Sequence, residues 1–168
     1  MKINKKKLLY FSLVAICLSC HSYTNAQGGK TALGWRFGWT EGITARHMIS
    51  DKNAIEGIIG FRHYGYSATF LFEQFQSTRT KMLSIYYGIG VHVGRNANRY
   101  YWVNNGRYKY YAYDNERHYG PDLLLGLEFR IPDTPIGLSL DIKPTVCFYS
   151  SGRTEVYPDP GLGIKVIF

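Results

Sequence analysis

Cysteine is nearly absent from this chain of 168 residues, which contains only Cys17, Cys20 and Cys147. We expect the first two to be removed with an N-terminal segment described below, so that one thiol remains. A single thiol cannot form an internal disulfide, and no Cys/His spacing typical of structural zinc survives. We therefore expect no metal and no cofactor, and a fold held together by backbone pairing and side-chain packing.

Long apolar runs are also missing from the chain after residue 26. None approaches the roughly 20 residues that a membrane-spanning helix needs, and no helical periodicity persists. The sequence has no glycine-rich phosphate loop, no internal repeat and no low-complexity linker. These absences argue against a helical membrane protein, a helix bundle and a nucleotide-binding fold.

The first 26 residues have the pattern of a secretory signal peptide. Lysines in residues 2–7 precede a short apolar run over residues 8–18 and then small polar residues. We expect cleavage after Ala26, which divides the chain into a signal peptide (1–26) and one domain (27–168). An alternative cleavage would place a lipid on Cys20, although Cys17 occupies a position where such a site prefers an aliphatic residue.

Loss of this segment halves the net charge of the chain. The segment carries four lysines and no acidic residue, so Lys+Arg falls from 20 to 16 against 12 acidic residues, and the net charge from +8 to +4. The mature protein is then only mildly basic, and nucleic acid is not an expected partner.

Alternation of apolar and polar residues is the dominant pattern of the mature chain, and it predicts strands with two unlike faces. It is strong over residues 83–93, 123–131, 136–148 and 161–168, and weaker over residues 33–39, 42–49, 54–61 and 66–75. The total is eight strands, an even number, as in single-chain bacterial outer-membrane barrels. The predicted fold is all-β, an eight-stranded antiparallel up-and-down transmembrane β-barrel.

The predicted connections after strands two, four and six are short: residues 50–53, 76–80 and 132–135. Those after strands five and seven are long: residues 95–118 and 150–159. Membrane barrels have short periplasmic turns and longer outward loops. The pattern therefore predicts an outer-membrane location with both termini in the periplasm.

Alternation alone does not say which face lines the interior, because a soluble lipocalin-like barrel alternates with its apolar face inward. Glycines on the polar face suit a narrow lumen, and aromatic residues near strand ends suit interfacial girdles. The polar face also carries both signs of charge, which we predict to form a lumenal network. Its predicted members are Arg36, Arg46, Glu56, Glu73, Glu128, Arg130, Asp141, Lys143 and Lys165. A barrel of eight strands leaves room only for side chains, so we expect a plugged lumen.

Three segments resemble a family of small outer-membrane β-barrel proteins of Bacteroidota, which are OmpA/OmpX-like eight-stranded barrels. They are GWTEGITARHMISDKNAIEGIIGFR (38–62), YYGIGVHVG (86–94) and DLLLGLEFRIPDTPIGLSLDIKPTV (122–146). The terminal aromatic Phe168 is similar to the signal by which such barrels are recognised for insertion. The resemblance implies the fold, the location in outer-membrane lipid and contact with the barrel-insertion machinery. It implies no catalytic residue.

Residues 95–118 combine aromatic and cationic side chains around Asn105-Gly106, a strong hairpin signal. We predict that strands five and six extend outward as a hairpin tipped there. Aromatic faces stack on sugars, and cations attract phosphate, so a surface glycan, lipopolysaccharide or a protein is a candidate partner. Alternatively, the tyrosines only stabilise cross-strand pairs. The candidate binding residues are Tyr100, Tyr101, Trp102, Arg107, Tyr108, Lys109, Tyr110 and Tyr111.

An enzyme is the remaining class to weigh, because some eight-stranded outer-membrane barrels modify lipid A. That chemistry needs an activated hydroxyl beside a histidine. No serine on the polar face stands in a recognisable signature with histidine, and the histidines show no metal-site spacing: His47, His63, His92 and His118. We therefore predict a monomeric structural or surface-interaction barrel without catalytic residues. The alternatives are a lipid A-modifying enzyme and a soluble ligand-binding barrel.

Overall fold

The structure, a computed structural model, describes residues 29–62, 65–80, 82–96, 101–104, 109–112 and 116–168, so the predicted signal peptide lies outside the described residues. The regular elements of this part of the chain are all strands. They are β1 (Thr31–Gly38), β2 (Glu41–Met48), β3 (Asn53–Arg62), β4 (Gly65–Ser77), β5 (Leu83–Asn96), β6 (Tyr101–Asn104), β7 (Lys109–Ala112), β8 (Arg117–Arg130), β9 (Ile136–Ile142), β10 (Thr145–Tyr149), β11 (Thr154–Tyr157) and β12 (Pro160–Ile167). Within these ranges, no helix has the length and apolar character that a membrane span requires.

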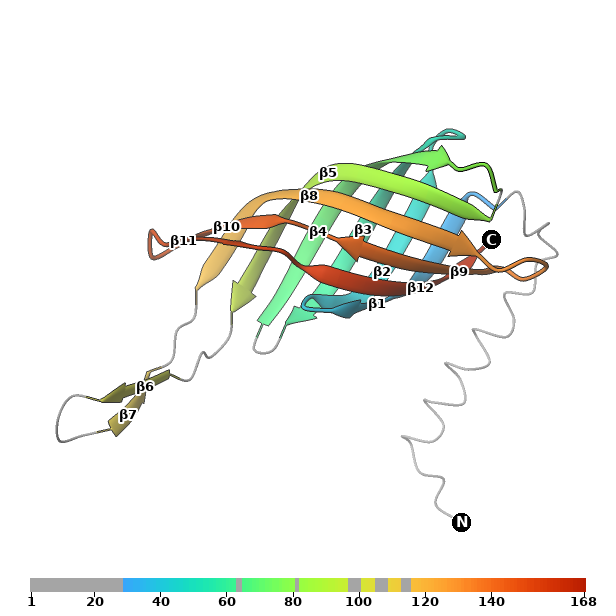
Figure 1. Cartoon of the computed structure of the whole chain (residues 1–168). Coiled ribbons are helices and arrows are strands. Elements are labelled where there is room, and N and C mark those ends of the chain that lie inside the picture. Colours follow the sequence, from blue (N-terminus) through green and yellow to red (C-terminus); the bar gives the residue numbers. More distant parts are fainter. Residues whose placement is uncertain (1–28, 63–64, 81, 97–100, 105–108, 113–115) are drawn as a thin grey trace, which may run out of the picture.

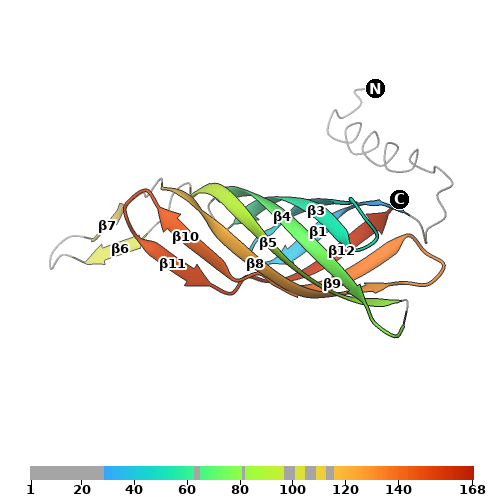
Figure 2. The same cartoon turned by 90° about the horizontal axis from the view of Figure 1, so that it is seen from above.

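Eight strands close into an antiparallel barrel, which confirms the predicted closed β-barrel. Strands β1 to β5 pair in sequence, β5 pairs with β8, and β8 pairs with β9. Strand β12 then pairs with both β9 and β1, and the register Trp35↔Ile164 closes the ring. Figures 1 and 2 show the resulting tube of tilted strands, with Phe168 at the end away from β6 and β7.

The chain is interrupted between β9 and β10 and again between β11 and β12, which differs from the prediction. The predicted strand 136–148 is divided into β9 and β10 at Lys143-Pro144, where proline has no N–H to donate. The predicted loop 150–159 contains β11, which continues into β12 past Asp159. Backbone hydrogen bonds between Lys143 and Asp159, of 3.0 and 3.2 Å, join the two interruptions. Strand β11 pairs with β10 and forms an edge of the sheet.

The segment between β5 and β8 contains a hairpin, as predicted. Its two strands form a sheet of their own and do not continue the barrel strands. Strands β6 and β7 make a two-stranded sheet of their own, with Asn104↔Lys109 as the pair nearest the turn. The predicted tip, Asn105-Gly106, lies outside the described residues. Strand β8 begins at Arg117, six residues before the predicted strand, so the barrel reaches further toward this hairpin than expected (Figure 1).

Charged side chains point into the barrel and apolar side chains point outward. Leu125 and Leu140 are 55% and 59% exposed, whereas Glu128 and Lys143 are 1% and 2% exposed. A soluble lipocalin-like barrel would have the opposite arrangement, with its apolar face inward. The inward-facing glycines and charges therefore line the lumen, as predicted from the glycines and the mixed charges of the polar face.

The lumen also holds a small apolar cluster, which the sequence reasoning did not anticipate. The rings of Phe75 and Tyr86 stack with their centroids 5.1 Å apart, and the Arg46 guanidinium lies 4.7 Å from the Phe75 centroid. The buried members are Ala54, Ile58, Leu71, Phe75, Tyr86 and Leu124.

Glycines on the inner and outer faces should respond differently to an added methyl group. At Gly42 in β2, a Cβ would overlap the backbone carbonyl oxygen of Ile59 on the neighbouring strand, whereas at Gly57 in β3 it would meet no atom within 4 Å. We expect Gly42→Ala to lower the free energy of unfolding by about 1–3 kcal/mol through overpacking. Gly57→Ala, the matched control, should be neutral or slightly stabilising. Denaturant unfolding of both variants measures this, and equal effects would contradict it.

Candidate functional site

The interior of the barrel contains a set of buried ionisable side chains, most of them in ion pairs, that we call the lumenal charge network. Its members come from most strands of the ring, and each is buried: Arg36, Arg46, Glu56, Glu73, Asp122, Glu128, Asp141, Lys143, Asp159 and Lys165. Eight of these were predicted from the sequence, and Asp122 and Asp159 were not. The predicted member Arg130 differs, because its side chain is 33% exposed while it contacts Glu128 at 3.2 Å.

Arg36 connects β1 to the strands that close the barrel. Its Nη2 lies 2.7 Å from Asp141 Oδ1, and its Nη1 lies 3.2 Å from Asp159 Oδ1. The guanidinium also donates to the backbone oxygens of Thr40 and Asp159, each at 2.8 Å. One arginine therefore satisfies two carboxylates and two carbonyls, which fits its rigid fork of donors.

Lys143 continues this group of charges around the strand interruptions. Its Nζ lies 3.0 Å from Asp159 Oδ2 and 3.5 Å from Asp122 Oδ1. Thr145 donates its hydroxyl to Asp122 at 2.7 Å. The residues at the break between β9 and β10 thus turn their polar groups into the lumen.

A second group of charges lies further toward the Phe168 end of the barrel. Arg46 Nη1 contacts Glu128 Oε2 at 2.5 Å, and Lys165 Nζ donates to Glu56 Oε2 at 2.5 Å. Thr44 donates a further hydrogen bond to Glu56. Each carboxylate of these two pairs has a cation from another strand, which burial away from water requires.

Glu73 differs from the other buried carboxylates. Neither of its oxygens has a hydrogen-bond partner among the described residues, although Glu56, Lys165 and Arg46 are its electrostatic neighbours. It lies on β4 opposite Ala54 of β3 and Gly88 of β5.

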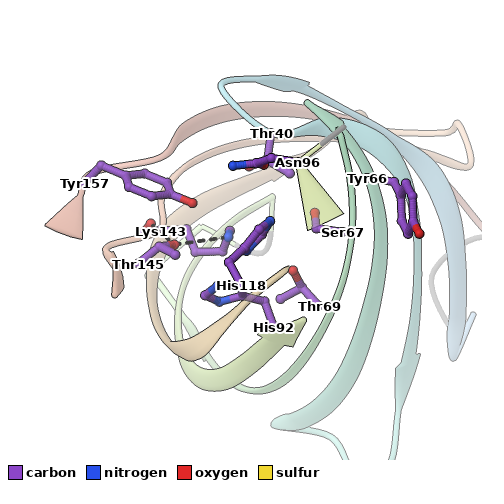
Figure 3. Close-up of a pocket in the computed structure, with 10 residues that line it drawn as sticks. All are labelled: Thr40, Tyr66, Ser67, Thr69, His92, Asn96, His118, Lys143, Thr145 and Tyr157. Atoms are coloured by element: carbon purple, nitrogen blue, oxygen red, sulfur yellow. Dashed lines mark hydrogen bonds between the residues drawn. The ribbon is translucent and has the colours of Figure 1, made fainter. Parts of the chain in front are cut away.

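At the opposite end of the lumen, three buried side chains form what we call the His–Cys cluster: His92 of β5, His118 of β8 and Cys147 of β10. Their nitrogen and sulfur atoms lie within 4.8 Å of one another. The Cys147 sulfur is 3.1 Å from His92 Nε2 and 3.8 Å from His118 Nδ1. Figure 3 shows both imidazoles inside the barrel beside Lys143 and Thr145.

Further polar groups surround the His–Cys cluster. The Asp122 carboxylate lies 3.1 Å from His92 Nδ1, and the Tyr157 hydroxyl lies 3.2 Å from the Cys147 sulfur. His92 and His118 line a cavity of about 10 Å³, together with Tyr157 and other polar side chains (Figure 3). This is room for about one water molecule or one ion.

Two glycines make space for the imidazoles. A Cβ at Gly94 would overlap the ring of His118, its cross-strand partner. A Cβ at Gly120, the partner of His92, would overlap the carbonyl oxygen of Val146 and lie 3.3 Å from His92 Cε1. The imidazoles can take these positions because residues 94 and 120 have no Cβ.

The alternation over residues 83–93 and 136–148 puts His92 and Cys147 on the polar faces of two predicted strands, but the sequence does not show that these residues meet. His118 fell in a predicted loop, and β8 includes it only because that strand begins at Arg117. Two imidazole nitrogens and a thiol at this spacing can bind a metal ion, or the thiol can be activated by a neighbouring imidazole. The expectation of no metal stays a prediction. The signal available in the sequence was the shared inward face of residues 92 and 147.

The predicted surface-binding residues fall in and around the separate hairpin. Trp102 of β6 is paired with Tyr111 of β7, and Val103 with Tyr110. Tyr101 and Lys109 also belong to these strands. The remaining predicted residues lie outside the described part of the chain: Tyr100, Arg107 and Tyr108.

Removal of a buried cation should destabilise the barrel more than removal of a partly exposed one. Arg46 and Arg130 both contact Glu128, but only Arg46 is buried. We expect Arg46→Met to lower the free energy of unfolding by about 3–5 kcal/mol, because a buried carboxylate loses its partner. Arg130→Met should cost about 0–1 kcal/mol. Denaturant unfolding provides the measurement.

A double variant separates pairing from packing in that experiment. In Arg46→Met/Glu128→Met neither charge remains, so we expect most of the lost stability to return. A double variant no more stable than Arg46→Met alone would contradict the assigned ion pair.

Comparison with known proteins adds no family assignment. No protein-family model matches the chain, and no curated protein matches it. The resemblance to the outer-membrane barrels of Bacteroidota therefore stays a prediction.

Proposed function

We propose that this protein is an outer-membrane β-barrel with a plugged lumen, which acts as a structural or surface-interaction protein. The observation that carries the proposal is the distribution of side chains over the two faces of the closed barrel. The outer face is apolar and the inner face holds paired charges. Function in this reading depends on the wall and on the hairpin at one end, with no enzymatic step.

The apolar outer surface extends around the whole ring. Strands on every side of the barrel expose large apolar side chains, including Ile43 of β2, Phe70 of β4, Val91 of β5, Leu140 of β9 and Ile164 of β12. Soluble monomers rarely expose continuous apolar patches larger than a few hundred Å². Contact with lipid removes this surface from water, and the free energy gained is about 25 cal/mol per Å² of apolar surface. A bilayer is the environment that suits such a surface on all sides.

The interior favours a closed barrel over an open channel. The guanidinium of Arg36 and the ammonium of Lys143 reach the carboxylates of Asp141 and Asp159 inside the barrel and occupy space there. The apolar cluster around Tyr86 occupies a further part of the lumen. Eight strands leave room only for side chains. We therefore expect no steady ion conduction through the wild-type barrel.

The proposed orientation places the Phe168 end in the periplasm. Phe168 and Thr31 exchange backbone hydrogen bonds of 3.0 and 2.8 Å, so the described chain starts and finishes at one end of the barrel. Short connections between β2 and β3 and between β8 and β9 lie at this end, and the β6–β7 hairpin lies at the other (Figure 1). Short periplasmic turns and longer outer loops are typical of outer-membrane barrels. The predicted signal peptide supports the export that this location requires.

The surface-interaction part of the proposal concerns the outer hairpin. Strands β6 and β7 form a sheet apart from the barrel, beyond the ends of β5 and β8 (Figure 1). The segment that contains them, residues 95–118, is rich in tyrosine, with arginine and lysine interleaved along its sequence. Such a surface suits sugars and phosphates, so we propose a surface glycan, the phosphates of lipopolysaccharide or a protein as its partner.

A charge placed on the outer wall tests the membrane assignment. We expect Leu125→Arg, near the middle of β8, to lower the free energy of unfolding in lipid vesicles by about 2–4 kcal/mol. Ser151→Arg, in the exposed turn between β10 and β11, is the control and should change it by less than about 0.5 kcal/mol. Urea unfolding of vesicle-folded protein measures both.

Two further observations accompany that experiment. The wild-type protein should require detergent for purification, and the unboiled barrel should migrate faster on a gel than the boiled chain. Full solubility without detergent, together with a neutral Leu125→Arg, would contradict the membrane proposal.

The hairpin is tested by removing its aromatic rings. Tyr108→Ser/Tyr110→Ser/Tyr111→Ser should weaken binding of the folded protein to lipopolysaccharide or to glycans by at least tenfold, because each stacked aromatic contributes about 1–3 kcal/mol. The matched Tyr→Phe triple variant keeps the rings and should retain most of the binding. Glycan-array and cell-adhesion profiles are the measurement, and identical profiles for wild type and the serine variant would count against this role.

A further inference from the structure

We propose that His92, His118 and Cys147 bind one late first-row transition-metal ion, with Zn²⁺ as the best fit. Two imidazole nitrogens and one thiolate are ligands that zinc takes in proteins, and soft sulfur disfavours magnesium and calcium. The site would lie inside the barrel near the β6–β7 end. It depends only on the barrel interior, so it holds whether or not the outer wall faces lipid.

The separations between the ligand atoms suit a tetrahedral ion. Zinc bonds of about 2.0–2.1 Å to nitrogen and about 2.3 Å to sulfur place nitrogen and sulfur about 3.6 Å apart. In the cluster, the Cys147 sulfur lies 3.1 Å from one histidine nitrogen and 3.8 Å from the other. The two imidazole nitrogens lie at most 4.8 Å apart, a separation that rotation of the side chains can adjust to the ion.

The surroundings resemble the outer shell of a metal site. Asp122 lies 3.1 Å from His92 Nδ1, so that the other nitrogen, Nε2, is the one turned toward Cys147. Metal-binding histidines commonly donate their second N–H to a carboxylate in this way, which fixes the tautomer and the ring orientation. Asp122 also contacts Lys143, at a longer distance of 3.5 Å, and is anchored by Thr145.

Charge and space are both compatible with an ion. The thiolate of Cys147 and the carboxylate of Asp122 together balance two positive charges, and the nearby Lys143 is already paired with Asp159 at 3.0 Å. The cavity of about 10 Å³ beside His92 and His118 offers space for a water molecule as fourth ligand (Figure 3). The Tyr157 hydroxyl, 3.2 Å from the sulfur, can hold that water or approach the ion itself.

The same residues also include the order Cys147–His92–Asp122, which in other proteins activates a thiol nucleophile. Two features favour the metal. His118 contacts the sulfur as well and has no role in such a triad, and Cys147 is 0% exposed. A nucleophile must meet its substrate, whereas a metal ligand is satisfied by burial.

The experiment uses the mature chain, folded in detergent and freed of metal with a chelator. Titration with Zn²⁺ against a chromophoric chelator should give one ion per chain. Co²⁺ should give the near-ultraviolet absorption band of a thiolate-to-cobalt bond, which shows that Cys147 is a ligand.

Variants then locate the site. Asp122→Asn should weaken Zn²⁺ binding about 10–100-fold as an outer-shell change, and Cys147→Ser and His118→Gln should weaken it further. His47→Gln is the matched control, because His47 is exposed and bonded to Thr31 at the other end of the barrel; it should bind Zn²⁺ as the wild type does. The gel shift of unboiled protein shows that each variant remains folded.

Several outcomes would overturn the proposal. These are the absence of Zn²⁺ binding by the folded wild type, binding that persists in folded Cys147→Ser, and Co²⁺ binding without the thiolate band. Rapid alkylation of Cys147 by iodoacetamide that Zn²⁺ does not slow would assign the residue as a free nucleophile instead. Protection of Cys147 from alkylation by one equivalent of Zn²⁺ would support the metal site.

Discussion

Ion pairing across a narrow interior is the constraint on which the rest of this structure depends. A charge on the inward face of a strand must meet an opposite charge from elsewhere in the barrel, because a buried unpaired ion costs several kcal/mol. Arg36 and Lys143 satisfy this condition by contacting two carboxylates each. The outward face is then free to be apolar, since it takes no part in the pairing. The division of polar and apolar residues over the two faces follows from this one requirement.

The strand pattern of the fold could be predicted from sequence because it depends on local alternation. A period of two fixes which residues share a face, and the inward positions of Glu56, Glu128 and Lys165 followed directly. Alternation did not tell whether the apolar face points into or out of the barrel. That could be inferred only from the mixed charges and the glycines of the polar face. The structure agrees with that inference.

Strand ends and interruptions could not be predicted, because partners distant in sequence decide them. Strand β8 begins at Arg117 since β5 pairs with it up to Arg95↔Arg117. Pro144 and Asp159 interrupt two strands, and the backbone link between Lys143 and Asp159 keeps the halves aligned. Asp122 and Asp159 were missed for this reason, since both fell outside the predicted strands.

The His–Cys cluster shows a second limit of sequence reasoning. His92, His118 and Cys147 lie on three adjacent strands, and no spacing along the chain brings them together. Only the registers His92↔Gly120 and Tyr149↔His118 place them at one level of the barrel. The need for glycine at positions 94 and 120 becomes clear only from the structure, which places imidazole rings beside both positions. A site built across strands leaves no motif in the sequence.

The long sequence separation within the lumenal ion pairs has a kinetic consequence. Arg36 and Asp141 are 105 residues apart, and Glu56 and Lys165 are 109 apart. A chain made from its N-terminus therefore carries its first buried arginine long before the matching carboxylate is synthesised. Contacts of such long range form late and slow folding. Closure of the ring therefore waits for β9 and β12, which supply the partners of the charges on β1 and β3.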